Sequence, residues 1–136
     1  EFAKKIMSHF NNKIDYYGFG FNPVKNKKDA IDPYLFSIAI ENSNYNNYWT
    51  EKIADVFLGY TCPIYYGCSN ISNYFDESSY IAIDINNIDF SISKIEYAFN
   101  NISLYQEEKI ALSRSKVLED YNFFNIISET INKEFS

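Results

Sequence analysis

Side chains that could bind an anion gather in the segment 41–52 (ENSNYNNYWTEK), between a predicted strand and the predicted helix that follows it. At the start of a helix the backbone N–H groups lack helical partners and the helix dipole is positive, so this terminus is a natural anion site. Lys52 lies in the first turn, where a lone cation opposes the dipole, but a diphosphate beside it makes the charge favourable. The segment therefore indicates binding of a small phosphorylated ligand.

Each of these side chains also has a purely structural explanation. Lys52 can be a surface lysine that points into water, and Glu51 suits the first turn of any helix because an acid complements the dipole there. Asn42 and Ser43 can satisfy backbone groups in a turn. The Tyr48 and Trp49 rings are of a kind that more often packs in a core than contacts a ligand. The residue types alone leave both interpretations open.

The elements that position this segment form a predicted βαβ unit. Residues 34–40 alternate Phe and Ile with small side chains, which predicts a strand. Apolar residues at helical spacing predict a helix over 50–60, with Thr50 as its N-cap and Gly59 near its end. An apolar strand is expected at 62–66, and a right-handed crossover makes the two strands parallel. Ligands of such sheets bind beyond the carboxyl ends of the strands, where the polar segment begins.

The rest of the chain continues the same alternation of helices and strands. Further helices are expected at 2–10, 91–99, 104–118 and 121–135, further strands at 13–17 and 80–85, and a polar loop at 22–33. The sequence therefore predicts an α/β fold, with a Rossmann-like parallel sheet of about four strands and helices on both faces. We expect a single domain over residues 1–136.

Composition and charge argue against several classes of protein. With 46% hydrophobic and 19% aromatic residues, the chain is too apolar to be disordered. Its net charge of −6 argues against nucleic-acid binding, which needs a dense positive field. One His and two Cys argue against a zinc site and against a disulfide framework. No apolar run approaches the ~18 residues that span a bilayer, so no transmembrane segment is expected.

The order of the motifs resembles the donor-binding region of family 10 glycosyltransferases, the α-1,3/1,4-fucosyltransferases. In that family a strand ends in FENS, a short loop leads to YxTEKI, and a strand of the PIYYG type follows. The matching pieces here are ENS at 41–43, YWTEKI at 48–53 and PIYYG at 63–67. KIDYYG at 13–18 is similar to a KVDxxG segment that precedes the motif in the family. The resemblance covers nearly the whole chain.

The resemblance implies a GT-B enzyme, in which two Rossmann-like domains face each other across a cleft and this chain is the C-terminal, GDP-fucose-binding domain. It implies that Lys52 contacts the diphosphate, that Glu51 contacts the ribose and that Asn42 lines the donor pocket. The predicted donor-binding set is Glu41, Asn42, Ser43, Tyr48, Thr50, Glu51 and Lys52. Transfer in the family inverts the sugar and needs no metal or other cofactor, which agrees with the lack of a DxD motif in this sequence.

Two departures from the family pattern lead us to expect that the chain is one piece of a two-domain enzyme and is inactive alone. The family's general base belongs to the N-terminal, acceptor-binding domain, so we assign no catalytic residue here and expect that domain to bind the glycan acceptor. A family arginine that contacts the donor falls upstream of residue 1, and Arg114 does not match it. We expect a bacterial cytoplasmic or inner-membrane-face location, or the Golgi lumen for a eukaryotic source. Two alternatives remain: a non-catalytic nucleotide-sugar-binding module, and a GT-B transferase with another donor.

Overall fold

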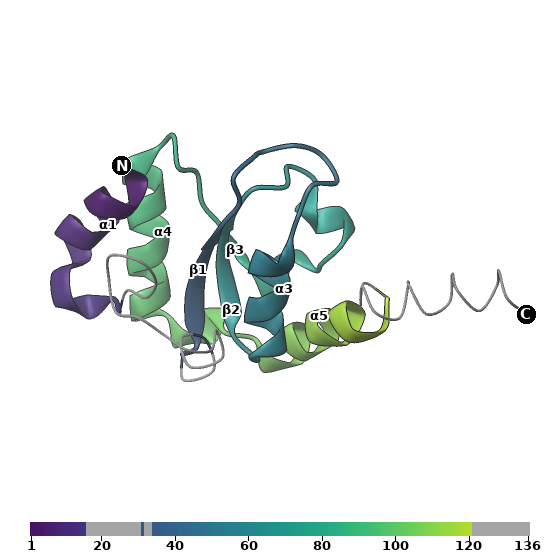
Figure 1. Ribbon diagram of the computed structural model, residues 1–136. Helices are drawn as coiled ribbons and strands as arrows, with labels where there is room; N and C mark the ends of the chain where they lie inside the picture. The colour runs from purple at the N-terminus through teal and green to yellow at the C-terminus, as the bar shows by residue number, and fades with distance from the viewer. Residues whose placement is uncertain (16–30, 32–33, 121–136) are drawn as a thin grey trace, which may run out of the picture.

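The computed structural model describes residues 1–15, 31 and 34–120, and within these ranges the chain forms a three-stranded parallel sheet (Figure 1). The central strand β2 (Cys62–Tyr66) pairs with β1 (Phe36–Ile40) on one side and with β3 (Ile81–Ala82) on the other. The register aligns Ile40 with Tyr66, so the carboxyl ends of β1 and β2 meet at one edge of the sheet. The loops at this edge carry the polar segment.

Helices cover both faces of the sheet, as predicted (Figure 1). One face carries α1 (Phe2–Phe10) and α4 (Ile88–Asn100), and the other carries α3 (Glu51–Leu58) and α5 (Glu107–Glu119). Short 3₁₀ helices fill four connections: η1 (Asn11–Lys13), η2 (Ile71–Asn73), η3 (Glu77–Ser79) and η4 (Ile102–Leu104). No helix within the described ranges is both long enough and apolar enough to cross a membrane.

The core is divided by the central strand into two clusters. Ile64 of β2 packs with Ile6 of α1 and Ile95 of α4, whereas the next residue, Tyr65, packs in the cluster beneath α3 and α5. This opposition follows from the pleat, which turns successive side chains to opposite faces. Cys62 is fully buried, and burial raises the pKa of its thiol to about 12, so it behaves as an apolar core residue.

The helix predicted over 50–60 is α3, and its two ends lie where the sequence indicates. Thr50 is the N-cap and Gly59 is the C-cap. Ile53, Val56 and Phe57 are buried against the sheet, which accounts for the helical spacing of the apolar residues. Local signals therefore sufficed to place this element.

Helix α5 lies against α3 and completes the second cluster (Figure 1). Its Ile110 and Val117 are buried there. The Arg114 Nε donates a hydrogen bond to the Leu58 carbonyl at 3.1 Å, and the Arg114 guanidinium lies 4.3 Å from the Tyr60 ring centroid. A cation at the carbonyl end of α3 also complements the helix dipole, so Arg114 joins the two helices.

The third strand is shorter than the sequence predicts. The alternation over 80–85 indicates a full strand, but β3 contains only Ile81 and Ala82. The Ile83 N–H still donates to the Tyr65 carbonyl at 2.9 Å, and there the pairing ends. The Ser91 hydroxyl bonds both the backbone N–H and the carbonyl of Asp84, at 3.0 and 2.6 Å, so these groups are not available to β2. The Ser91 side chain of α4 thus takes the place of the next β2–β3 ladder partners at Asp84.

The first predicted strand is not formed in the part of it that the structure describes. Lys13 ends η1, and the two residues that follow it are not in a strand. Residues 16 and 17 lie outside the described residues, as do the predicted helix at 121–135 and nearly all of the predicted loop at 22–33. The helix predicted from residue 91 begins earlier, at Ile88, because Asn87 caps it through the Phe90 N–H.

Candidate functional site

The first turn of α3 is fixed by the side chain of its N-cap residue. Thr50 is extended, with φ −127° and ψ −171°, and its Oγ1 accepts a hydrogen bond from the Lys52 N–H at 3.2 Å. Glu51 follows the cap and is exposed. The N-terminus of α3 therefore begins at a defined point beside the carboxyl end of β1.

Glu41 connects the end of β1 to this cap. Its side chain is only 2% exposed, and one carboxylate oxygen accepts from the Thr50 N–H at 3.1 Å. The other oxygen accepts from the Thr50 hydroxyl at 2.7 Å. The Glu41 backbone N–H donates to the Tyr66 carbonyl at 2.8 Å, which continues the β1–β2 ladder. Glu41 thus lies inward, with both carboxylate oxygens bonded to Thr50.

Gly67 and Tyr65 enclose the Glu41 side chain. A Cβ atom at position 67 would lie 2.3 Å from the Glu41 Cγ and 2.6 Å from the Tyr65 hydroxyl, so only glycine fits there. Burial raises the pKa of Tyr65, and the Glu41 carboxylate raises it further. The neutral Tyr65 hydroxyl accepts a hydrogen bond from the Cys68 N–H at 3.1 Å. Glu41 is therefore held by the residues that end β2.

Lys52 and Asn42, two of the predicted site residues, lie together. The Lys52 Nζ donates to the Asn42 Oδ1 at 3.2 Å. Asn42 is exposed and Lys52 is half-buried. Within the described residues Lys52 forms no ion pair with a carboxylate, so no acidic side chain in this part of the chain neutralises its charge. The ammonium group is free to accept an anion next to the start of α3.

Tyr48 lies at the surface, whereas Trp49 packs against the core. The Trp49 ring packs edge-on against Tyr74 and Phe75, with centroid distances of 5.8 and 5.4 Å. Tyr48 is 37% exposed, and its ring contacts Tyr45 with the centroids 6.5 Å apart. The structural alternative of core packing therefore applies to Trp49, whereas the Tyr48 ring is open to a ligand.

The seven predicted donor residues thus lie in one region, which we call the polar edge: the segment 41–52 together with the residues 65–70 that contact it. Ser43 is half-buried beside Asn42. Two contributions to this region could not be predicted from the sequence: the close approach of Gly67 to Glu41, and the contacts of Asn70 with the polar segment. No group of three or more His, Cys, Asp or Glu side chains that could hold a metal ion occurs in the described ranges.

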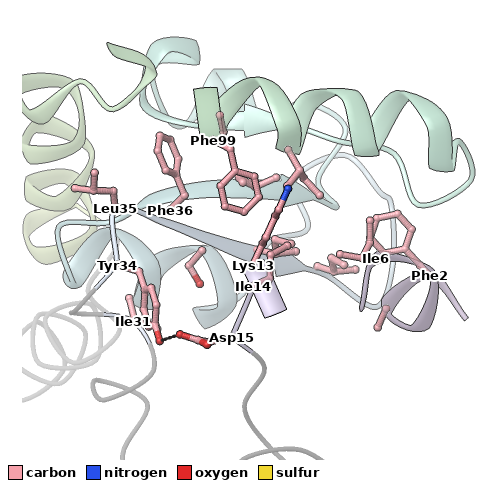
Figure 2. Close-up of a pocket in the computed structure, with 17 residues that line it drawn as sticks. Phe2, Ile6, Lys13, Ile14, Asp15, Ile31, Tyr34, Leu35, Phe36 and Phe99 are labelled. Atoms are coloured by element: carbon pink, nitrogen blue, oxygen red, sulfur yellow. Dashed lines mark hydrogen bonds between the residues drawn. The ribbon is translucent and has the colours of Figure 1, made fainter. Parts of the chain in front are cut away.

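Among the cavities that the described residues form, two lie near the sheet and differ in lining. The larger, which we call the apolar cavity, measures about 630 Å³ and lies among α1, β1 and α4, lined by side chains such as Phe2, Ile14 and Phe99 (Figure 2). None of the seven predicted donor residues lines either cavity. The smaller, of about 460 Å³, lies at the carboxyl ends of β2 and β3 and is lined by Gly67 and Asp84 among others. The carboxyl ends are where ligands of parallel sheets bind, so the smaller cavity is the one that borders the site.

The acidic pair at 76–77 belongs to a turn, and Glu77 also lines the smaller cavity. The Asp76 carboxylate accepts a hydrogen bond from the Ser78 N–H at 2.8 Å and caps η3. The hydrogen bonds from Ser78 lower the pKa of Asp76, and Lys109 lowers it further from 3.6 Å. The pair is exposed, as expected for a solvated turn.

Comparison with known proteins identifies the family to which this fold belongs. The family model for the C-terminal part of glycosyltransferase family 10 (fucosyltransferase) matches residues 1–107. The chain belongs to this family. The match spans α1, the three strands, α3 and α4, so the fold is that of the C-terminal, Rossmann-like half of a GT-B glycosyltransferase. The resemblance seen in the sequence is thereby confirmed.

Individual relatives of the family 10 chain are fucosyltransferases. It is 34% identical over 87 residues to the α-(1,3)-fucosyltransferase FucT of Helicobacter pylori, a match that covers 63% of this chain and 18% of that protein. It is also similar to crystal structures of an α1,3-fucosyltransferase with GDP and with GDP-fucose. The TM-scores are 0.56 and 0.55, the identities 27% and 28%, and each match covers 75% of this chain and 36% or 37% of the other. The chain therefore spans well under two thirds of the relatives it matches.

Proposed function

We propose that this chain is the donor-binding domain of an inverting fucosyltransferase that transfers fucose from GDP-fucose to a glycan hydroxyl without a metal ion. The observation that carries the proposal is the Lys52 ammonium, which lies at the N-terminus of α3 with Asn42 as its hydrogen-bond partner and forms no ion pair with a carboxylate of the described residues. A cation beside free N–H groups is suited to a diphosphate. Relatives whose structures were solved with GDP and GDP-fucose support this choice of ligand.

The charges of the polar edge suit the departure of GDP. Negative charge builds on the diphosphate as the bond to fucose breaks, and Lys52 with the N–H groups of α3 stabilises it. Asn42 orients the Lys52 ammonium through their hydrogen bond. Tyr48 and Glu51, both exposed at the same edge, are in position to contact the nucleoside, with Glu51 on the ribose. Ser43 and Thr50 complete the donor pocket through the turn and the helix cap.

The general base of this reaction comes from outside the chain. Both oxygens of the Glu41 carboxylate are bonded to Thr50, so we assign Glu41 a positioning role in the pocket. In the full enzyme a base from an N-terminal domain deprotonates the acceptor hydroxyl, which attacks the sugar carbon in line with the leaving GDP and inverts its configuration. That domain also binds the glycan acceptor, and residues 1–136 alone are inactive. A lysine in place of a DxD motif accounts for transfer without a metal.

The location that goes with this function is the bacterial cytoplasm or the inner face of the membrane, which the bacterial relative supports. GDP-fucose is the donor substrate, and the function requires no cofactor. For a eukaryotic source, the proposed location is the Golgi lumen.

The experiment that tests the proposal is isothermal titration of the chain with GDP, GDP-fucose, GDP-mannose and UDP, with and without EDTA. We expect the guanine nucleotides to bind, UDP to bind far more weakly, and EDTA to change nothing. Preference for UDP indicates a transferase with another donor. Binding that EDTA abolishes contradicts metal independence. If the full-length protein binds GDP-fucose but does not transfer fucose, the non-catalytic module is the correct alternative.

A further inference from the structure

Two asparagines join the polar segment to the turn that follows β2. The Asn47 N–H donates to the Asn70 Oδ1 at 2.7 Å, and the Asn70 Nδ2 donates to the Asn47 Oδ1 at 2.9 Å. We call these two residues the Asn47–Asn70 pair. Because each residue is both donor and acceptor, the two segments are fixed in one register. Asn70 is far from Asn47 in the sequence, so the pair is a tertiary contact and not a local turn.

The surroundings of the pair strengthen this connection. The Tyr74 hydroxyl also donates to the Asn47 Oδ1, at 2.6 Å, and the buried Cys68 thiol lies 3.1 Å from the Asn70 Oδ1. Asn47 has a positive φ of 64°, a left-handed conformation that asparagine adopts more readily than most residues. Asn47 is therefore suited to the left-handed backbone at this position, and its amide oxygen accepts the hydrogen bonds from Asn70 and Tyr74.

The pair lies on one side of Tyr48 in the chain, and an anchored residue lies on the other. Asn47 precedes Tyr48 and is bonded to Asn70. Trp49 follows Tyr48 and packs against Tyr74 and Phe75. The backbone at Tyr48 is thus fixed on both sides while its ring stays exposed. Beyond Trp49 comes Thr50, which Glu41 holds at the start of α3.

We propose that the Asn47–Asn70 pair positions the donor-binding residues, and that Asn70 is a positioning residue for the nucleotide. The pair holds the segment in the conformation that presents Tyr48 and leads into the first turn of α3. Without the pair, the segment 41–52 would be ordered only when the nucleotide binds. The entropy lost in that ordering weakens the affinity for the nucleotide. This role rests on the proposed function, because the ligand is the GDP portion of the donor.

The test is the variant Asn70→Ala in the same chain, with Asn101→Ala as the matched control. Asn101 also makes one exposed side-chain hydrogen bond, to the Tyr97 carbonyl at 2.9 Å, but it follows α4 at the opposite end of the sheet. We expect Asn70→Ala to weaken GDP binding about tenfold, as the loss of two neutral hydrogen bonds allows. We expect hydrogen exchange of the Asn47 and Tyr48 amides to become faster, and Asn101→Ala to change neither measurement.

The outcomes separate the pair from the proposed function. If the unaltered chain binds GDP and Asn70→Ala binds it equally well, the positioning role is wrong and the donor function stands. If the unaltered chain binds no guanine nucleotide, the donor function fails, and the positioning role fails with it. Should Asn70→Ala lower the thermal midpoint sharply, Asn47→Gly replaces it, since glycine keeps the left-handed backbone and the N–H donor. An Asn47→Gly chain with unchanged GDP affinity and unchanged exchange at Tyr48 overturns the proposal.

Discussion

The polar edge and the apolar cavity differ in lining and in what their charged groups contact. The apolar cavity is the larger of the two cavities described above, and side chains of α1, β1 and α4 line it, with Asp15 bonded to the Tyr34 hydroxyl (Figure 2). At the polar edge, Glu41 is buried with both oxygens bonded, while Lys52 keeps a charge that no carboxylate neutralises within the described residues. Lys13 of the apolar cavity likewise has no ion pair among the described residues, so the proposed binding site is distinguished by its position at the carboxyl ends of the strands, and not by cavity volume.

The largest effect is expected from adding one methyl group at the polar edge. Gly67→Ala places a carbon 2.3 Å from the Glu41 Cγ and should lower the free energy of unfolding by about 3 kcal/mol. Removing a whole ring from the apolar cavity, in Phe99→Ala, should cost only about 1 kcal/mol, since Phe99 is 47% exposed. Urea unfolding of both variants measures the difference. Equal losses show that the polar edge is no more tightly packed than the cavity.

The next effect concerns affinity and not stability. Lys52→Ala should weaken GDP binding by a factor of about 10 to 100, since it removes a charged hydrogen-bond donor, while the unfolding midpoint changes little. Lys13→Ala, which removes a lysine from the lining of the apolar cavity, is the matched control and should leave GDP affinity unchanged. Titration calorimetry compares the two. The assignment of the site to the polar edge is refuted by the reverse result, a loss of affinity in Lys13→Ala alone.

The smallest effect tests whether Glu41 acts through Thr50. Glu41→Gln leaves one acceptor oxygen for the two Thr50 donors, so we expect a loss of about 1–2 kcal/mol in stability and a few-fold loss in GDP affinity. In a Thr50→Ala background the same substitution should cost less, because the hydroxyl partner is already absent. Denaturation and titration of the four chains give the coupling. Fully additive losses contradict an action through Thr50 and favour direct contact of Glu41 with the donor.

The sequence sufficed where the determining interactions are local. Thr50 caps α3 through the N–H two residues later, and Gly59 ends the helix, so both could be read from neighbouring residue types. The fold class followed from the same kind of signal, because each helix and strand carries its own apolar spacing. The family motif added the positions of the predicted donor residues, which local patterns alone left open between a binding site and a solvated helix end.

The sequence did not suffice where distant residues decide the structure. The inward orientation of Glu41 depends on Gly67, and nothing near position 41 indicates that approach. The early end of β3 depends on Ser91, which bonds the Asp84 backbone from another element. The Asn47–Asn70 pair likewise joins two turns whose asparagines are each ordinary in isolation. Contacts between such distant residues can be identified only in the folded structure.

Helix α5 lies almost wholly beyond the residues that the family model matches, but it is part of the core. The family match ends at residue 107, where α5 begins, yet Ile110 and Val117 of this helix are buried in the core with α3, and Arg114 binds the Leu58 carbonyl at the end of α3. The region that the family model matches is thus shorter than the region that forms the core. Among the described residues, two aliphatic side chains and one cation of α5 therefore complete a core of which the family model matches only the earlier part of the chain.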